Sequence, residues 1–458
     1  MRIATRAFDA RHHYLSRSLS SSFLIVGFGL VVVLFGSTTN QILAADFNNV
    51  NPKSLVWESR AELPLGGRHH PITFANATHG FALTGSTLQS SYTSDFLIYE
   101  EATDTWTDVS NTNSAFPGTA RSFGYGVAGT SNCNNDNANG NTNTNTKAYL
   151  GFGADASGQR LTDWWEFDMS THNWKRLAEF PGNGRRHPAM NFVEQVGEIH
   201  VGLGDGNGGN YNDWWSYSIA NDEWQQLLDF PSSPRHHPFY FSIDTDSYVG
   251  FGHSSSNITR DLYRYDSIER TWNREEDFAS YALGGDSSST DMLSSAISTN
   301  TIDAIERNSV SLPVTTEARV AGTQFTITGG SCNSDQQTYG FILSGDGDNH
   351  GHMETGEFHV FNPMMSEDEY SPSWYSLPPH PGLSRWAPGS FVLQGSSQVY
   401  MIGGYDRQMS ILYADMWTMN LEPLFDDDEG ISSGRIRSSI QYCYWSLPVL
   451  ISSLSLIF

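Results

Sequence analysis

Short runs of strand-forming residues, separated by Gly, Asn and Asp, recur along most of this chain. One segment shows the pattern in full: an apolar stretch through Phe192 and Val193 is followed by the strand-like run 198–204, the aromatic run 213–217 and Trp224. Runs of this length and composition are typical of β-strands bounded by turns. Each such segment is therefore expected to form a small antiparallel meander.

Four of these segments share a fixed spacing between an acidic residue and a tryptophan. The Trp follows the Asp by 11 residues at Asp95 and Trp106, Asp163 and Trp174, Asp213 and Trp224, and Asp261 and Trp272. A constant offset inside a variable period of roughly 50 residues indicates a repeat array. A single four-stranded meander exposes both faces and is only marginally stable, so neighbouring repeats must cover one another. Sheets stacked around a common axis do this, which predicts an all-β β-propeller.

An arginine begins each copy of the repeat. These residues are Arg68, Arg121, Arg186, Arg235, Arg319 and Arg385. The sixth copy lacks its last strand, because the position 11 residues after Asp415 is Asp426, inside an acidic run. The segment 55–57 belongs to no copy, and Trp57 precedes Arg68 by the same 11 residues that separate Trp224 from Arg235. We predict that this N-terminal strand completes the last blade and closes a ring of six.

The fifth copy is irregular and leaves a second blade count open. The gap between Trp272 and Trp374 is 102 residues, close to two periods. A degenerate seventh blade is therefore the alternative to six.

The repeat resembles that of the kelch family of β-propellers, whose period is close to 50 residues. The matching features are the opening Arg, the aromatic strand after Asp, the closing Trp and a strand that ends in Gly403-Gly404. The resemblance covers about residues 55–421. Three copies depart from the paired glycine and carry Gly-x-Gly instead, at 151–153, 202–204 and 250–252.

Both ends of the chain carry apolar segments, which divide it into 1–45, 46–425, 426–441 and 442–458. The first segment has four Arg before an apolar core and is expected to be a secretory signal peptide, with a signal anchor as the alternative. The propeller is expected at 46–425, followed by an acidic, polar spacer. The apolar tail at 442–458, after the small residues Ser432, Ser433 and Gly434, resembles a glycolipid-anchor signal, with a transmembrane tail as the alternative. We therefore expect an extracellular or cell-surface protein attached to the membrane by its terminus.

Charge and modification signals agree with that location. The formal net charge is −25, which disfavours nucleic acid as a partner. Asn76 and Asn257 begin glycosylation sequons. Cys133 and Cys332 lie in corresponding loops of copies two and five, and a disulfide between them is possible only if these loops meet.

Histidines next to the opening arginines are the candidate ligand-binding residues. Arg68, Arg186 and Arg235 are followed by His-Pro motifs that contribute His69, His70, His187, His236 and His237. If these residues surround one end of the central channel, the imidazole and guanidinium groups form an anion site suited to carboxylated or sulfated sugars. The alternative is structural: the resemblance implies that Arg at this position binds loop carbonyls and stacks on aromatic rings.

A second cluster, in the irregular fifth copy, mixes carboxylates with imidazoles. Asp346, Asp348, His350 and His352 offer ligands for Ca²⁺ or a transition metal, although their spacing fits no EF-hand loop. A polar turn is the simpler interpretation, and no cofactor is expected.

The sequence thus predicts a binding module that recognises an extracellular protein or glycan through its Arg/His mouth. The alternative is a carbohydrate-active enzyme at the same mouth. Some kelch-like propellers are sugar-acid mutarotases, which the resemblance implies need an Arg, a His and a carboxylate, and others are copper-radical oxidases, which need a suitably placed Cys. Fold alone does not decide between binding and catalysis.

Overall fold

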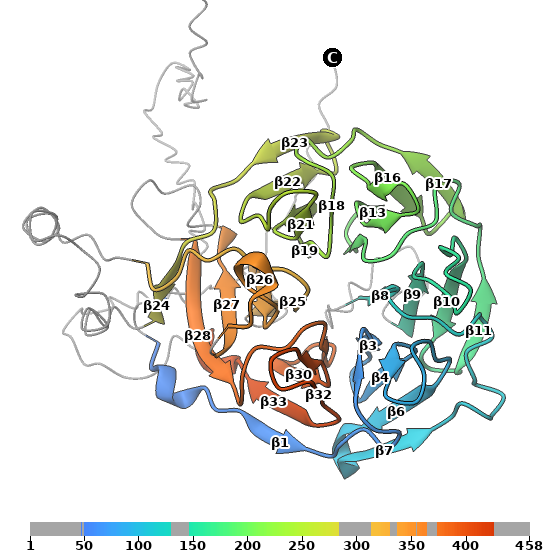
Figure 1. Cartoon of the computed structure of the whole chain (residues 1–458), viewed down its shortest axis with the longest axis horizontal. Coiled ribbons are helices and arrows are strands. Elements are labelled where there is room, and N and C mark those ends of the chain that lie inside the picture. Colours follow the sequence, from blue (N-terminus) through green and yellow to red (C-terminus); the bar gives the residue numbers. More distant parts are fainter. Residues whose placement is uncertain are drawn as a thin grey trace, which may run out of the picture. The chain divides into compact units, whose positions relative to one another are not determined.

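The computed structural model describes residues 47, 50–129, 146–283, 313–329, 337–353, 355–363 and 373–425. Within this part of the chain, antiparallel sheets follow one another in chain order around a common axis (Figure 1). No helix among the described residues is long and apolar enough to cross a membrane. The leader, the acidic spacer and the apolar tail lie outside the described residues.

Each of the first four blades is a sheet of four strands in chain order from the axis outward. Blade one consists of β3 (Ile72–Ala75), β4 (His79–Leu83), β6 (Phe96–Glu100) and β7 (Thr105–Asp108). Blade two consists of β8 (Tyr125–Ala128), β9 (Lys147–Gly151), β10 (Trp164–Asp168) and β11 (Asn173–Arg176). Blade three consists of β12 (Ala189–Val193), β13 (Glu198–Gly202), β16 (Trp214–Ser218) and β17 (Glu223–Gln226). Blade four consists of β19 (Phe239–Ile243), β20 (Asp246–Gly250), β22 (Leu262–Asp266) and β23 (Thr271–Arg274).

The last two blades each add a strand from elsewhere in the chain. Blade five consists of β25 (Thr323–Gly329), β26 (Gln337–Leu343), β27 (Gly356–Phe361) and β28 (Trp374–His380), with β24 (Ser280–Ala282) parallel to β28 at its edge. Blade six consists of β29 (Gly389–Val392), β30 (Gln398–Ile402), β33 (Met416–Asn420) and β1 (Glu58–Arg60). The fold is therefore a six-bladed β-propeller, and the extra strand of the fifth copy is an edge of blade five rather than part of a seventh blade.

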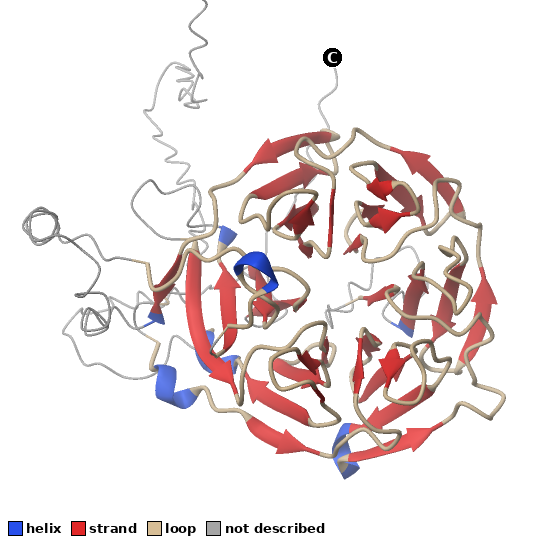
Figure 2. Ribbon diagram, viewed as in Figure 1, coloured by secondary structure: helices blue, strands red, loops and turns tan. Residues whose placement is uncertain are grey.

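The remaining elements are short and lie in loops (Figure 2). Two-stranded ribbons pair β2 (Arg68–His69) with β5 (Ser86–Thr87), β14 (Asp205–Gly206) with β15 (Gly209–Asn210), β18 (Arg235–His236) with β21 (His253–Ser254), and β31 (Tyr405–Asp406) with β32 (Ile411–Leu412). The 3₁₀ turns include η1 (Pro52–Ser54), η2 (Glu101–Thr103), η6 (Asp348–His350) and η8 (Glu422–Leu424).

The N-terminal strand closes the ring as predicted, but three residues later than expected. β1 pairs antiparallel with β33, and Ser59 lies opposite Trp417. Trp57 precedes this strand and donates a hydrogen bond from Nε1 to the carbonyl of Pro378 in blade five, at 3.1 Å. Four other closing tryptophans make the same bond to the preceding blade: Trp106 to Ala61, Trp174 to Ser114, Trp224 to Ala178 and Trp272 to Leu228. Trp57 therefore has the closing role even though it comes from the other end of the chain.

The irregular fifth blade keeps the same register. Trp374 lies opposite Phe361, as Trp224 lies opposite Tyr217 in blade three. Glu357 occupies the place of the strand-opening Asp, and the hairpin between this acid and Trp374 is 17 residues long rather than 11. The repeat is thus intact in space, and only its loop is longer.

The Gly-x-Gly copies preserve the conformation of the paired glycine. Gly403 and Gly404 have φ angles of 61° and 93°, and Phe152 and Gly153 have 63° and 91°. The first position lies in the left-handed region, which other residues can adopt, whereas a φ near 90° strongly favours glycine. A Cβ on Gly153 would also lie 2.4 Å from the Ser122 carbonyl oxygen. Only the second glycine is therefore required.

Candidate functional site

The first residues of each blade converge on the propeller axis at one end of the channel. Two positions after each buried arginine described below, the chain has a left-handed residue with φ between 48° and 67°. We call these six residues the inner ring: His70, Phe123, His187, His237, Ala321 and Ala387. Backbone N–H groups link several of them around the axis, from His187 to the Phe123 carbonyl at 3.0 Å and from His237 to the His187 carbonyl at 3.3 Å. The fold thus fixes the backbone there and leaves the side chains to vary.

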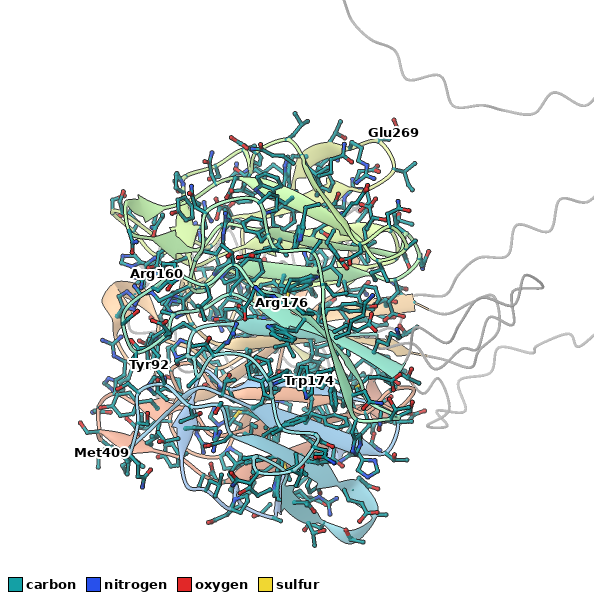
Figure 3. The ribbon with its side chains drawn as sticks, turned by 90° about the vertical axis from the view of Figure 1, so that its right-hand side faces the viewer. Tyr92, Arg160, Trp174, Arg176, Glu269 and Met409 are labelled. Carbon is teal, nitrogen blue, oxygen red and sulfur yellow. The ribbon has the colours of Figure 1, made fainter. Side chains whose placement is uncertain are left out.

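The loops around this ring form one face of the propeller. Because the strands run antiparallel, the second-to-third strand loops of all blades extend on the same side as the inner ring. Figure 3 shows three residues of these loops, Tyr92, Arg160 and Met409, at one edge of the ring, and Glu269, from a hairpin of the opposite face, at the other. We call the first side the mouth face.

A cavity of about 450 Å³ opens among these residues. It is lined by Phe123, Arg186, His187, His236, His237, His350, Trp386, Tyr405 and Arg407. Its volume lies in the range of small-ligand sites, and its mixture of aromatic rings with a few charged groups is typical of them.

Two arginines contribute guanidinium groups to the cavity. Arg186 donates from Nε and Nη2 to Oδ2 of Asp205, at 3.0 and 2.6 Å, and lies over the Phe123 ring. Arg407 donates from Nη1 to Oδ2 of Asp346 at 2.7 Å and lies 5.8 Å from the Trp386 ring centroid. Their side chains are 30% and 43% exposed. Each guanidinium therefore has a fixed orientation and further N–H groups that face solvent.

Three inner-ring histidines form a buried cluster. One ring nitrogen from each of His70, His187 and His237 lies within 4.8 Å of the others. Nε2 of His70 is 3.0 Å from Nε2 of His237, and the rings of His187 and His237 stack with centroids 3.5 Å apart. Nδ1 of His187 donates to Oδ1 of Asp205 at 2.8 Å, given that the carboxylate can only accept. Its Nε2 is buried and has no hydrogen-bond partner among the described residues.

Burial keeps these imidazoles neutral. Burial, and then the charge of neighbouring histidines, moves the pKa values of His70 and His237 well below the usual value. Burial lowers the pKa of His187 to about 4, although Asp205 opposes this shift. Burial by itself raises the pKa of Asp205, but the hydrogen bonds from His187 and Arg186 outweigh this and hold its pKa well below the usual value. At neutral pH the site thus combines neutral imidazoles with a charged Asp–Arg pair.

Five of the six predicted arginines do not line the cavity. The buried arginines of the blades are Arg68, Arg121, Arg185, Arg235, Arg319 and Arg385, each at most 2% exposed. Each pairs with the acid that opens the third strand of its blade: Asp95, Asp163, Asp213, Asp261, Glu357 and Asp415. Five of them also lie over an aromatic ring. These six arginines therefore have the structural role that the alternative interpretation predicted, and none of them lines the cavity.

The third blade shows why Arg186 differs from the others. Arg185, not Arg186, makes the buried pair there, with Nη1 2.6 Å from Oδ1 of Asp213. Counting back from the His-Pro motif places Arg185 level with Arg68 and Arg235, which is the sequence signal that identifies it. Arg186 is one position further along and points into the cavity, beside His187.

Two predicted histidines lie beside the cluster. Nδ1 of His69 is 2.7 Å from Nδ1 of His70, and its ring also packs on Trp386. His236 lines the cavity and its Nδ1 is 3.0 Å from Oδ1 of Asn210.

The structure separates the four predicted metal ligands of the fifth copy. Asp346 is buried and paired with Arg407, whereas Asp348 and His352 are exposed. His350 lies 3.7 Å from Asp346 and bonds His253 at 3.1 Å. Among the residues that the structure describes, the ligand atoms of these four side chains do not all lie within 4.8 Å of one another. The ligand atoms of His70, His187 and His237 do.

The remaining predicted sites are the two glycosylation sequons, the two loop cysteines and the anchor residues. Asn76 lies in the turn between β3 and β4, where its Oδ1 accepts bonds from the backbone of Thr78 and His79. Asn257 is exposed in the loop after β21, on the mouth face. Cys133, Cys332 and the anchor residues 432–434 lie outside the described residues.

Five residues of the site were not predicted from the sequence, and Phe123 of the inner ring is one of them. Trp386 is equivalent to Arg186 in position, one residue after the buried arginine, and Tyr405 and Arg407 follow Gly404 on the loop of blade six. Asp205 likewise follows Gly204 in blade three. Residues just after the repeated glycine were a usable signal, because that loop always leads to the mouth face.

No protein-family model matches this sequence, and a search of curated proteins finds no significant match. The six-bladed arrangement is consistent with a kelch-type propeller. A β-propeller with a lined cavity on its axis supports a general role as a binding module.

Proposed function

We propose that this protein is a kelch-type propeller that binds an acidic carbohydrate, carboxylated or sulfated, in the cavity of its mouth face. The observation that carries the proposal is the presence of two oriented guanidinium groups, on Arg186 and Arg407, together with the rings of Trp386 and Tyr405 around one cavity.

The guanidinium groups supply recognition of an anion. A guanidinium presents planar N–H donors that match a carboxylate or sulfate, and orientation by Asp205 and Asp346 reduces the entropy lost on binding. These two aspartates also neutralise the arginines, so the pocket attracts anions through directed N–H donors rather than through a large net charge. Recognition of the anion therefore depends on these short-range bonds, because the overall charge of −25 repels polyanions at longer range.

The aromatic groups favour a sugar over a simple anion. Trp386 and Tyr405 are both partly exposed in the cavity, and aromatic rings contribute large apolar contact with one polar edge. The less polar face of a pyranose ring packs on such surfaces while its hydroxyl groups bond the surrounding donors. His236, which lines the cavity, is one such polar partner.

A glycan array with neutral, carboxylated and sulfated sugars tests this proposal. Wild-type protein is expected to bind acidic glycans, and Arg186→Met and Arg407→Met to lose most of that binding, about 10-fold or more for a charged hydrogen bond. Arg176→Met is the matched control, because Arg176 is equally a surface arginine but lies on the outer strand β11. Binding of neutral sugars alone, equal loss in the control, or capture of a protein ligand without any glycan would contradict the proposal.

A second candidate function is catalysis on a sugar acid. The carboxylate of Asp205 contacts both the guanidinium of Arg186 and the imidazole of His187 beside the cavity. This is the residue set that mutarotase-like chemistry requires. Turnover of a bound sugar acid by the purified protein, abolished by His187→Asn, would favour the enzyme, and unchanged ligand after binding favours the binding module.

We further propose that the protein acts at the cell surface, held by a glycolipid at 432–434 and carrying glycans at Asn76 and Asn257. The apolar segments at both ends of the sequence support this location. Release from intact cells by a phosphatidylinositol-specific phospholipase is the expected result, and retention after that treatment counts against the anchor.

A further inference from the structure

The histidine cluster has features that ligand binding in the cavity does not explain. His70, His187 and His237 come from blades one, three and four, and each is at most 5% exposed. Buried polar groups are normally hydrogen-bonded, so a buried ring nitrogen without a partner needs an explanation. Nε2 of His187 is buried and has no hydrogen-bond partner among the described residues, and the same holds for Nδ1 of His237.

The left-handed backbone of these histidines is not itself evidence of a site. Phe123, Ala321 and Ala387 have the same conformation at the equivalent positions of the other blades. The left-handed backbone at these six positions is a feature of the propeller fold, whereas the histidines at three of them are a feature of this sequence. These histidines bring three nitrogen ligands to the axis.

We propose that His70, His187 and His237 bind a divalent transition-metal ion, with zinc as the best fit to three neutral imidazoles. Three histidines with an open fourth position are a recognised protein site for Zn²⁺, with Zn–N distances of about 2.0–2.1 Å. The ligand atoms lie within 4.8 Å of one another, so that small side-chain movements bring all three within reach of one ion.

The surroundings orient the proposed ligands. Asp205 accepts a hydrogen bond from Nδ1 of His187, which leaves Nε2 as the lone-pair donor of that ring. A carboxylate behind a ligating histidine is the usual supporting interaction of such sites. His69 bonds Nδ1 of His70 at 2.7 Å and leaves its Nε2 toward the cluster. The apolar rings of Phe123 and Trp386 pack against His70 and limit the access of water.

One adjustment is needed for metal binding. The rings of His187 and His237 are stacked and only 29° from parallel, so their lone pairs do not yet converge. Rotation of both rings about the Cβ–Cγ bond opens the stack around the ion. Both residues line the cavity, which places the fourth coordination position toward it. An acidic group of a bound ligand could occupy that position, but metal binding itself does not depend on the proposed sugar.

Titration of the purified chain with Co²⁺ tests the inference without any activity assay. We expect one equivalent to bind, with a visible absorption spectrum typical of four-coordinate Co²⁺, and Zn²⁺ to displace it. His70→Asn, His187→Asn and His237→Asn are each expected to weaken binding by at least 100-fold, and Asp205→Asn by about 10-fold. Asparagine is the chosen replacement because it tolerates the left-handed backbone at these positions.

The control is the double variant Asp348→Asn with His352→Asn, in the other predicted metal cluster and outside the cavity. It is expected to bind Co²⁺ as the wild type does. Circular dichroism of each variant establishes that the chain is folded. The inference is overturned if the folded wild type binds no stoichiometric Co²⁺, if binding persists in His187→Asn and His237→Asn, or if only the control loses it.

Discussion

Arg185 and Arg186 are neighbours in the sequence, but one is buried in its blade and the other lines the cavity. Arg185 is fully buried and bonds both Asp213 and the Leu203 carbonyl, while Arg186 is 30% exposed at the cavity. Breaking a buried ion pair leaves an uncompensated charge, which is costly even where the intact pair adds little stability. The six buried arginines are therefore best understood as structural members of their blades.

This distinction predicts opposite results for two adjacent substitutions. Arg185→Met is expected to lower the free energy of unfolding by about 3 kcal/mol, because Asp213 loses its partner. Arg186→Met should cost about 1 kcal/mol, since Asp205 retains its bond to His187, but should lose ligand binding. Urea unfolding followed by tryptophan fluorescence measures both. Equal destabilisation by the two variants would contradict these assignments.

His380, a buried histidine outside the cavity, is expected to make the folding stability depend on pH. Burial, and then the charge of Arg385, lowers the pKa of His380 to about 3. The unfolded chain takes up this proton below about pH 6.5, whereas the folded chain does not until near pH 3. Folding stability from this group is therefore complete above pH 6.5 and declines as pH falls through that window, by about 2 kcal/mol at pH 5. Unfolding curves of His380→Gln should decline less between pH 7 and pH 5, and parallel curves would refute this assignment.

At the scale of the strand, the closing tryptophans define the repeat better than spacing does. Trp374 has the same register as Trp224 although its hairpin is longer, and Trp57 makes the same inter-blade bond from the other end of the chain. The six blades and their closure could be predicted from the sequence because they depend on apolar runs and on an acid-to-Trp spacing that four copies share. The closing strand was predicted three residues too early, because the prediction included Trp57 in the strand, whereas it lies just before β1.

The closing role of Trp57 makes a quantitative prediction. Trp57→Ala loses the bond to Pro378 and contacts with the rings of Phe358 and His380, so we expect a destabilisation of about 2–3 kcal/mol. Trp224→Ala should cost a similar amount because that residue is equivalent in blade three. Val56→Ala, at a side chain 60% exposed, is the neighbouring control and should change stability by less than about 0.5 kcal/mol. If Trp57→Ala behaves like the control, the N-terminal segment does not close the ring.

At the scale of the whole molecule, the propeller fold fixes the backbone conformation of the inner ring, whereas the residue types at its six positions differ. Innermost strands of neighbouring blades contact one another all the way around, including β29 with β3. This brings residues as distant as His70 and His237 to one point on the axis. The sequence predicted that the Arg/His motifs would meet at a mouth. It could not show which side chain of each motif turns inward, because that depends on the left-handed turn after the buried arginine.

The central claim is that the mouth cavity recognises the acidic group of a sugar. Calorimetric titration of the purified chain with a glucuronate-ended disaccharide, and with the same disaccharide after reduction of its carboxylate to an alcohol, tests it most directly. We predict saturable binding of the acid, at least 10-fold weaker binding of the alcohol, and no such difference in Arg186→Met. Equal affinity for both sugars, or a preference for the acid that survives in Arg186→Met, would contradict the account.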